Sequence, residues 1–163
     1  MALNMESFIP ATPYGIIELL KRYEINTSGK NTVVIGRSNI VGRPISILLS
    51  RKGNPGDSTV TLVHSRTKNL ESFTKNADII VSALGVPDFL KSEMVKKGVI
   101  IIDVGITRVK DDSNSKGYVI KGDVDFESVK EKASFITPVP GGVGPMTIAC
   151  LLKNTIECFK RSR

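Results

Sequence analysis

The stretch VVIGRSNIVGRPISILL, residues 33–49, constrains the fold more than any other part of the chain. It begins with β-branched residues, continues as a turn with two glycines and a serine, and ends in an apolar segment entered through Pro44. This order predicts a buried strand, a tight turn and a helix, since β-branched residues favour strands and proline favours the first helical position. Such a turn suits a phosphate, because glycines let the backbone approach closely and a helix N-terminus offers unpaired N–H groups.

The glycine spacing of this turn departs from the dinucleotide fingerprint G-x-G-x-x-G. Ser38 occupies the position of the second glycine, and the last glycine, Gly42, falls one residue late. Spacing alone therefore leaves two interpretations open. The segment is either a dinucleotide site or an ordinary connection between a strand and a helix.

Strand-like and helix-like segments alternate along the chain. After the strand at residue 33, further strands are predicted over 59–64, 77–85, 99–105 and 134–137, and helices over 12–23, from 44, and over 69–76, 87–97, 125–132 and 147–160. Residues 106–122 interrupt this order as a predicted hairpin. The alternation predicts a three-layer α/β fold with a doubly wound, Rossmann-like parallel sheet, formed as a single domain over residues 1–163.

Two of the predicted helices have specific signals. Thr12 and Pro13 suit the N-cap and first position of the first helix. The last helix is amphipathic, and its apolar face is formed by Ile148, Leu151, Leu152, Ile156 and Phe159. Its two cysteines, Cys150 and Cys158, lie too far apart for a disulfide within a regular helix, so we expect free, buried thiols.

Length and composition are those of a globular protein. The chain has 163 residues, of which 40% are hydrophobic and 24% charged, enough for one domain with a sizeable core. No apolar run approaches the roughly 20 residues that span a bilayer, and the N-terminus does not resemble a signal peptide. With free thiols, these features predict a cytoplasmic protein without a membrane partner.

The formal net charge of +7 does not indicate a nucleic-acid partner. Its 23 basic residues are scattered from Lys21 to Arg163, there is no tryptophan, and the aromatic residues do not alternate with the basic ones. Nucleic-acid binders instead gather basic residues on one face and add stacking aromatics. A basic balance also suits a polyanionic small molecule, or simply a solvated surface.

The end of the second predicted strand, His64-Ser65-Arg66-Thr67, indicates which cofactor would bind. An NAD site normally carries an acidic residue here for the ribose 2′-hydroxyl, whereas an NADP site replaces it with arginine or hydroxyl groups. No acid is present, and Arg37 in the first turn could converge on the same phosphate. Two arginines suit a charge-assisted grip on a phosphate, so the sequence predicts NADP as the cofactor.

His64, the only histidine, has two interpretations. It could be a catalytic base, but we favour a residue that packs beside the cofactor or is simply exposed. We predict no metal site, because no cluster of His, Cys, Asp or Glu has metal-ligand spacing. A nucleophile elbow and a P-loop are also absent from the sequence.

The segment PVPGGVGPMT, residues 138–147, has three prolines and three glycines. Prolines fix some backbone dihedrals and glycines free others, so the result is a shaped loop with little side-chain bulk. A flat backbone surface at the open end of the sheet suits a planar ring. A rigid connection to the last helix is the alternative, although it would not need so many glycines.

Five motifs together resemble one family. The motifs are TPYG (12–15), GRSNIVGRP (36–44), HSRT (64–67), DVGI (103–106) and PVPGGVGPMT (138–147). They resemble the bifunctional methylenetetrahydrofolate dehydrogenase/methenyltetrahydrofolate cyclohydrolase family over essentially the whole chain, and the last motif is very specific to it. The resemblance implies NADP-dependent oxidation of 5,10-methylene-tetrahydrofolate to 5,10-methenyl-tetrahydrofolate, followed by hydrolysis to 10-formyl-tetrahydrofolate.

The resemblance also implies site residues and partners. Cofactor contacts would come from Gly36, Arg37, Ser38, Ser65 and Ile106, to which the reasoning above adds Arg66. The tetrahydrofolate substrate would lie against Pro140, Gly141, Gly142, Val143 and Gly144. Members of the family are typically homodimers in contact largely through this domain, so a homodimer is expected.

The chain departs from the family in its length. Members are about twice as long, and an N-terminal domain supplies the catalytic Tyr-x-x-x-Lys pair. No tyrosine here has a lysine four residues later, so we expect an internal start at Met1, no catalytic residue in this chain, and NADP binding with negligible folate turnover. The loop over 51–58 also exceeds the usual family turn, which we expect to be harmless.

Two other classes of function stay open at this point. The chain could be a stand-alone nucleotide-binding module without folate chemistry. It could also be the cofactor domain of another dehydrogenase that acts on an amino or hydroxy acid.

Overall fold

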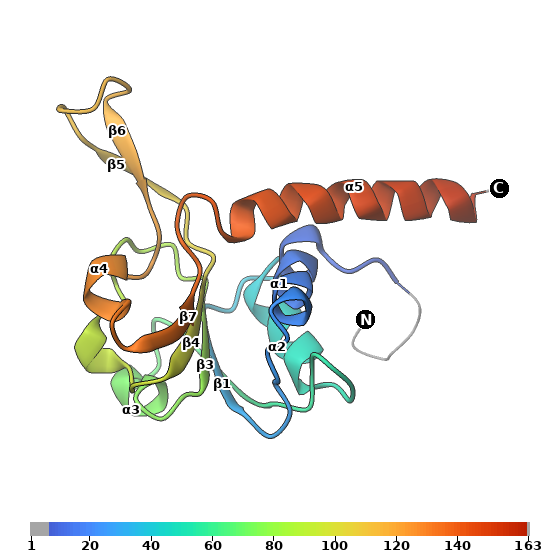
Figure 1. Ribbon diagram of the computed structural model, residues 1–163, viewed down its shortest axis with the longest axis horizontal. Coiled ribbons are helices and arrows are strands. Elements are labelled where there is room, and N and C mark those ends of the chain that lie inside the picture. Colours follow the sequence, from blue (N-terminus) through green and yellow to red (C-terminus); the bar gives the residue numbers. More distant parts are fainter. Residues whose placement is uncertain (1–6, 163) are drawn as a thin grey trace.

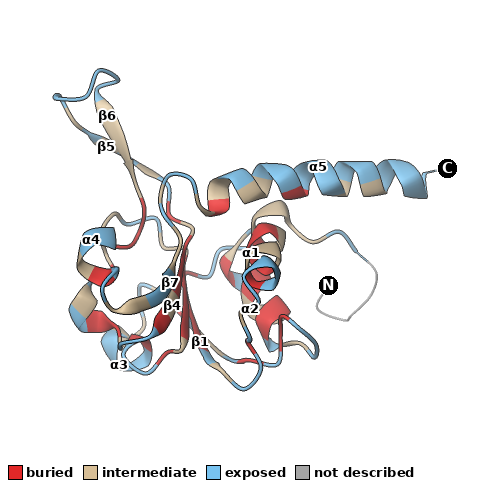
Figure 2. Ribbon diagram, viewed as in Figure 1, coloured by how far each residue is buried: buried red, intermediate tan, exposed pale blue. Residues whose placement is uncertain are grey.

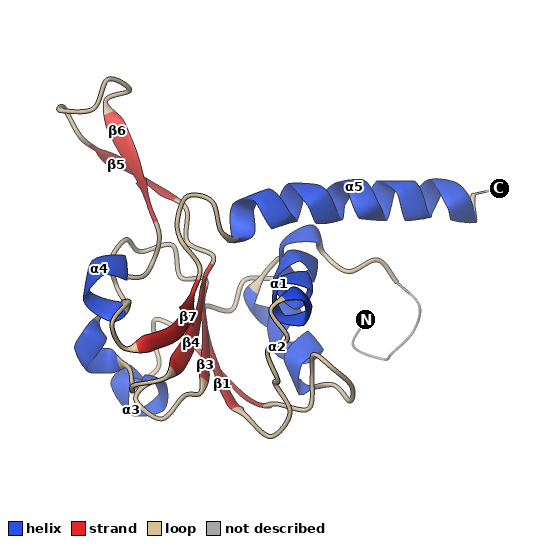
Figure 3. Ribbon diagram, in the orientation of Figure 1, coloured by secondary structure: helices blue, strands red, loops and turns tan. Residues whose placement is uncertain are grey.

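A computed structural model describes residues 7–162 and contains a five-stranded parallel sheet. The strand order is β2-β1-β3-β4-β7, with β1 at Asn31–Ile35, β2 at Thr59–Val63, β3 at Ile79–Ser82, β4 at Val99–Asp103 and β7 at Ala133–Ile136. These are the five strands that the sequence predicts, within a few residues at their ends. The doubly wound parallel sheet is therefore confirmed (Figure 3).

Helices cover both faces of the sheet and complete the three predicted layers (Figure 1). One side carries α1 (Ala11–Arg22) and α2 (Gly42–Ser50), and the other carries α3 (Leu70–Thr74) and α4 (Phe126–Val129). Each side has its own hydrophobic cluster. Val34 packs with the α1 and α2 side, whereas Val33 and Ile35 pack with the opposite side. This double burial explains why β1 is a continuous apolar run, as expected of a central parallel strand.

The first helix begins two residues earlier than its sequence signals predict. Its N-cap is Pro10, and the N–H of Tyr14 donates to the Pro10 carbonyl at 3.0 Å. Thr12 therefore lies inside the helix, where its side chain accepts a hydrogen bond from the Thr147 hydroxyl at 3.1 Å. The prediction of Thr12 as N-cap is wrong because this hydroxyl serves a contact between two helices.

The prediction of a helix over 87–97 is also wrong. This segment contains only a 3-10 turn, η1, at Ser92–Met94. Leu90 instead forms a parallel bridge with Val124, in which its N–H donates to the Asp123 carbonyl at 2.9 Å. A long-range backbone pairing has replaced the local helical bonds that the sequence pattern favours.

The last helix, α5 (Val143–Arg161), starts four residues before its predicted first residue. It lies along α1, held by a Lys153–Glu18 ion pair at 3.3 Å and by the Asn154 side chain, which donates to the Ile9 carbonyl. Its buried residues are only Val143 and Cys150, and much of the helix is exposed in Figure 2. Cys158 is exposed as well, so the prediction of two buried thiols holds for Cys150 alone.

The apolar face of α5 stays uncovered within the described part of the chain. Side chains along it are between 52% and 60% exposed: Ile148, Leu151, Leu152, Ile156 and Phe159. The periodicity of these residues is helical as predicted, but all five side chains are more than half exposed rather than buried in a core.

The predicted hairpin is confirmed as β5 (Thr107–Lys110) and β6 (Tyr118–Lys121), which pair in antiparallel register. It projects away from the sheet (Figure 1), and the Arg108 guanidinium lies over the Tyr118 ring at 4.8 Å. None of the helices found in residues 7–162 is both long and apolar enough to cross a bilayer.

Candidate dinucleotide-binding site

The candidate site lies beyond the carboxyl ends of the parallel strands. The chain passes from β1 to β2 on one side, and then to β3 on the other side of β1. Ligands of open α/β sheets bind at such a switch point, where the connections leave in opposite directions and open a crevice. The turn after β1 therefore lies at the switch point, where a ligand is expected to bind.

Close packing explains both glycines of this turn. Gly36 has φ +108°, and a Cβ placed there would lie 2.2 Å from the Ala83 carbonyl oxygen at the end of β3. A Cβ at Gly42 would lie 2.0 Å from the Gly36 carbonyl oxygen. The turn, the neighbouring strand and the start of α2 can approach this closely only without these side chains. The displaced last glycine of the pattern, Gly42, thus has a structural reason.

The turn after β1 presents free backbone donors to solvent. The Ser38 hydroxyl accepts from the N–H groups of Val41 and Gly42 at 3.1 and 3.2 Å, so Ser38 stabilises the start of α2. The exposed N–H groups of residues 37–40 find no acceptor among residues 7–162. Unpaired donors beside a helix N-terminus fit a phosphate group, as a dinucleotide requires.

The turn after β2 is fixed by bonds between its own residues. The N–H of His64 donates to the Thr67 hydroxyl at 3.0 Å, and the N–H of Arg66 donates to His64 Nδ1 at 3.1 Å. His64 therefore shapes this turn, which favours its structural interpretation over the catalytic one. Ser65 and Arg66 remain exposed at the tip.

The two turns are neighbours. The N–H of Gly36 donates to the Val63 carbonyl at 2.8 Å, which brings Arg37 to the same corner as Ser65 and Arg66. Within residues 7–162, neither arginine forms an ion pair with a carboxylate. The corner thus carries two exposed cations without an acidic partner, and it fits a phosphate on the ribose.

Two cavities lie at the other end of the edge, near β4 and β7. One, of about 430 Å³, is lined by Thr12, Val41, Val104, Ile106, Val143, Gly144, Thr147 and Ile148. A second, of about 260 Å³, lies between residues 103–106 and 138–145. Ile106 is 64% exposed and lines both, so it stands between them as an apolar wall suited to a planar ring.

The predicted folate-side residues differ in how far they are exposed to solvent. Pro140 and Gly141 are exposed, and Gly142 and Gly144 are half-buried. Val143 is only 3% exposed, because it starts α5 and packs into the cluster on the α1 side. The cavity of about 260 Å³ is lined by all five residues, so they do share one surface.

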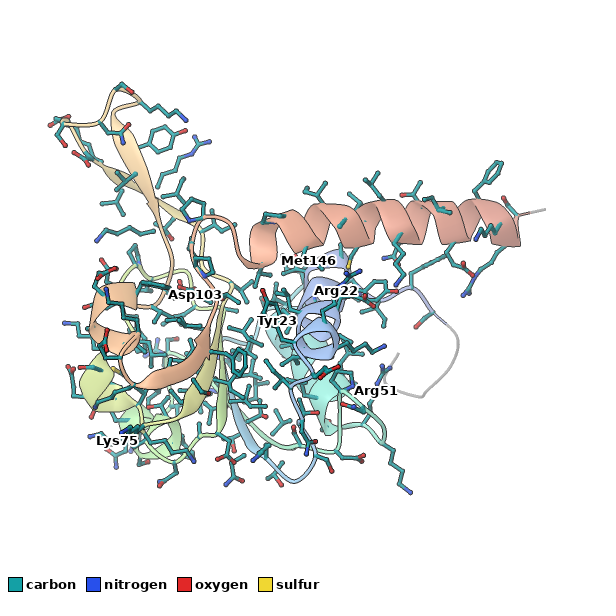
Figure 4. The ribbon with its side chains drawn as sticks, viewed as in Figure 1. Arg22, Tyr23, Arg51, Lys75, Asp103 and Met146 are labelled. Carbon is teal, nitrogen blue, oxygen red and sulfur yellow. The ribbon has the colours of Figure 1, made fainter. Side chains whose placement is uncertain are left out.

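Two buried carboxylates at this edge have no assigned role in the sequence-based prediction. Asp103 ends β4, where it lies below the projecting hairpin (Figure 4), and it is 3% exposed; Asp123 follows β6 and is fully buried. Burial raises the pKa of Asp103 to about 6, against the lowering effect of three backbone hydrogen bonds. The sequence could have identified Asp103 as a candidate site residue, because this carboxylate comes directly after a wholly apolar run.

The residues present fit a dinucleotide better than a metal. The described residues include no group of three or more His, Cys, Asp or Glu side chains that could hold a metal ion. Along the carboxyl edge of the sheet, the crevice instead offers exposed arginines, free backbone donors and an apolar surface suited to a planar ring.

Comparison with known proteins agrees with this geometry. The family model for the tetrahydrofolate dehydrogenase/cyclohydrolase NAD(P)-binding domain matches residues 10–163. The chain is 80% identical over 160 residues to the bifunctional protein FolD of Flavobacterium johnsoniae, a match that covers 98% of this chain and 54% of that protein. The chain thus spans about half the length of the curated relatives it matches.

The chain also aligns with about half of each of two solved structures. The crystal structure of the bifunctional enzyme FolD from Campylobacter jejuni aligns with a TM-score of 0.89 at 52% identity, covering 99% of this chain and 54% of that one. The Trypanosoma brucei enzyme, solved with an NADP cofactor and an inhibitor, aligns with a TM-score of 0.90 at 42% identity, with the same coverage.

Proposed function

The chain belongs to the tetrahydrofolate dehydrogenase/cyclohydrolase family, as its NAD(P)-binding domain, and from this membership we propose the function of the site. It is the NADP-binding half of an enzyme that oxidises 5,10-methylene-tetrahydrofolate to 5,10-methenyl-tetrahydrofolate and hydrolyses the product to 10-formyl-tetrahydrofolate. The observation that carries the cofactor assignment is the corner of Arg37, Ser65 and Arg66, joined by the Gly36–Val63 hydrogen bond.

NADP selectivity arises at this corner. The two guanidinium groups and the Ser65 hydroxyl hold the 2′-phosphate, and the absence of a carboxylate at the end of β2 removes the usual partner of an unphosphorylated ribose. The free N–H groups of residues 37–40 and the N-terminus of α2 hold the pyrophosphate. These contacts bind and orient without taking part in bond breaking.

The other end of the crevice places the reacting ring. Bound NADP supplies the acceptor for the hydride that leaves the methylene carbon of the substrate. Ile106 and Gly144 line the apolar cavity beside that ring. The loop of Pro140 and Gly141 lines the adjacent cavity, where the tetrahydrofolate lies.

The groups that move protons come from outside this chain. Asp103 lines the folate-side cavity, but it is 3% exposed and both of its oxygens accept from backbone N–H groups, so we do not assign it this role. The cyclohydrolase step requires a positioned base and a water. The half of the family's proteins that this chain does not span supplies them. The exposed apolar face of α5 is the surface on which that half packs, because Ile148, Leu151, Leu152 and Ile156 are 52–60% exposed there.

A homodimer is part of the proposal. Tyr23 and Phe135 are 60% and 44% exposed and pack edge to face at 6.2 Å beside β7, an edge strand. They border an apolar cavity of about 310 Å³ that a second copy would cover. Light scattering on the purified chain reports the mass in solution. We also propose a cytoplasmic location, in keeping with the free thiols of Cys150 and Cys158.

Titration calorimetry of the 163-residue chain with NADP and with NAD tests the cofactor assignment. We expect heat of binding from both and clearly tighter binding of NADP. Equal affinity for the two would overturn the role of the arginine corner. Binding of neither would overturn the assignment of a working cofactor site to this chain.

A further inference from the structure

The buried carboxylate of Asp123 holds the loop that follows β3. One of its oxygens, Oδ2, accepts from the N–H groups of Leu84 and Gly85 at 2.6 and 3.1 Å and from the Ser82 hydroxyl at 3.3 Å. This loop lies beside the turn after β1, since a Cβ at Gly36 would meet the Ala83 carbonyl oxygen that precedes the loop, and it lies beside Gly105, since a Cβ there would meet Asp123 Oδ1. Asp123 thus fixes a wall of the cofactor site from a position 40 residues later in the sequence than that wall.

The carboxylate of Asp103 holds the loop that follows β4. Its Oδ1 accepts from the N–H of Gly105 at 2.9 Å, directly before Ile106 in the chain. The same oxygen accepts from the N–H of Asp123 at 3.0 Å, and Oδ2 accepts from Val124 at 3.0 Å. Asp103 therefore ties together the wall beside the ring cavity and the segment that carries the other carboxylate.

The two carboxylates pack as one unit with no room to adjust. A Cβ at Gly105 would lie 2.2 Å from Asp123 Oδ1, and a Cβ at Gly122 would lie 1.9 Å from Asp103 Oδ2. Asp123 Oδ1 has no hydrogen-bond partner although it is buried. A buried acceptor without a protein partner costs the fold free energy.

The charged surroundings do not neutralise the pair. Asp123 is the charged group that faces Asp103 across the sheet edge, and its charge raises the pKa of Asp103 further. The neighbouring cation, Lys121, is paired with Asp88 instead, and the segment also carries Asp125, whose side chain accepts from the Ser128 N–H to cap α4. Ionised Asp103 is thus held by backbone N–H groups rather than by a cation.

We propose that Asp103 and Asp123 are positioning residues for the ring end of the dinucleotide crevice. Asp123 acts through Leu84 and Gly85, and Asp103 acts through Gly105, so the two together set the width of the crevice beside Ile106. The inference rests on the proposed NADP-binding function. The arginine corner has its own bonds around Gly36 and His64 and is remote in the chain from Gly105, so loss of the Asp103 bonds leaves it in place. Asp123 also supports the segment beside Gly36, so its removal reaches the corner to a smaller degree.

Substitutions at the two sites have different expected effects. In Asp123→Asn the amide oxygen can keep both backbone bonds, and its NH₂ can take the place of the unpartnered Oδ1. Asp103 uses both oxygens as acceptors, so Asp103→Asn must place an NH₂ against an N–H donor. Asp123→Ala removes all acceptors. A matched control is Val99→Ala, which trims a buried side chain at the opposite end of β4.

Calorimetry with two probes, NADP and adenosine 2′,5′-bisphosphate, separates positioning from folding. The bisphosphate occupies the arginine corner and the turn after β1, and it lacks the nicotinamide half that reaches the ring end of the crevice. We expect Asp103→Asn to weaken NADP by about tenfold or more and to bind the bisphosphate as the wild type does. Asp123→Ala should weaken NADP to at least the same degree, and more than it weakens the bisphosphate. Asp123→Asn should stay within about threefold for NADP, and Val99→Ala should unfold at a lower temperature with unchanged binding of both probes.

Each contrary result has a distinct meaning. Equal losses for the two probes would overturn the positioning role in favour of a general effect on the fold. Unchanged NADP affinity in Asp103→Asn and Asp123→Ala would overturn it directly. If wild-type protein bound neither probe, the proposed function itself would fail. Should Asp123→Ala not fold, the difference between Asp103→Asn and Asp123→Asn still decides, because equal NADP affinities there contradict the geometry.

Discussion

The N–H of Gly36 donates a hydrogen bond to the carbonyl of Val63 at 2.8 Å, and this bond joins the turns after β1 and β2. Residues separated by almost 30 positions in the sequence thereby form one corner of the crevice. The consequence is chemical as well as structural, because Arg37 and Arg66 then face the same ligand group.

Replacement of either arginine by alanine should weaken NADP by about 10- to 100-fold, the equivalent of one charge-assisted hydrogen bond to phosphate. NAD affinity should change little, because NAD lacks the 2′-phosphate. Titration calorimetry of Arg37→Ala and Arg66→Ala with both cofactors measures this difference. Lys97→Ala, an exposed cation just before β4, is the control for loss of overall charge. Equal losses for NADP and NAD would contradict the assignment.

A second prediction concerns the tight contact between Gly36 and Ala83. Gly36→Ala should abolish NADP binding and destabilise the fold, because its Cβ would meet the Ala83 carbonyl oxygen at 2.2 Å. Gly53→Ala is a matched control, since Gly53 has a similar φ of +113° but open space around it. Both substitutions carry about 1–3 kcal/mol of backbone strain, and only Gly36→Ala adds the clash. Chemical denaturation measures the stability of the two variants, and calorimetry measures their NADP affinity. Equal stability and equal affinity in the two variants would contradict the prediction.

The raised pKa of Asp103 makes a prediction about stability and pH. Its ordinary value of 3.8 rises to about 6 through burial, so the folded state binds the proton more tightly than the unfolded state. The contribution of this carboxyl group to the free energy of unfolding is therefore most favourable below about pH 4, and it is lost as the pH rises through 6. The full effect is on the order of 3 kcal/mol.

Urea unfolding of wild type and Asp103→Asn between pH 4 and pH 7.5 measures this contribution. The variant cannot ionise, so its stability relative to wild type should increase with pH across this window, while the other titrating groups cancel in the comparison. A constant difference between the two proteins over the whole range would show that the carboxyl does not titrate in it.

The fold followed from sequence wherever local pattern and tertiary packing agree. The strands were predictable because β1, β3 and β4 are apolar on both faces, as buried parallel strands must be. Residues 87–97 failed because Leu90 pairs its backbone with residues 123–125, a contact that no local pattern contains. In α5 the periodicity identified which residues share a face, but periodicity does not report what covers that face.

The candidate site was predictable to a similar extent. Arg37, Ser65, Arg66 and Ile106 follow strand ends, and strand ends of a parallel sheet meet at one edge, so their convergence could be expected. Asp123 could not be placed in the same way. It follows a strand of the hairpin rather than of the main sheet, and only the folded structure brings it beneath Leu84 and Gly85.

The chain by itself should not oxidise tetrahydrofolate substrates. None of its tyrosines is followed four residues later by a lysine, and the carboxylate of Asp103 at the crevice is engaged by backbone N–H groups. NADPH formation from NADP and 5,10-methylene-tetrahydrofolate, followed by absorbance, should stay at the buffer rate. The Gly36→Ala variant distinguishes a contaminant from real turnover, because a contaminating enzyme would be equally active in both preparations. Activity that only the wild-type chain shows would contradict this prediction.

The last prediction concerns the exposed face of α5. Leu152 and Ile156 are 60% and 58% exposed, so polar substitutions there should change the free energy of unfolding by no more than about 0.5 kcal/mol. On the buried side, where α1 packs against the sheet, Ile16→Ala should cost about 2–5 kcal/mol, because Ile16 is fully buried. Urea unfolding of Leu152→Gln, Ile156→Gln and Ile16→Ala gives the three values. A large loss in either glutamine variant would contradict the exposure of this face in the folded chain.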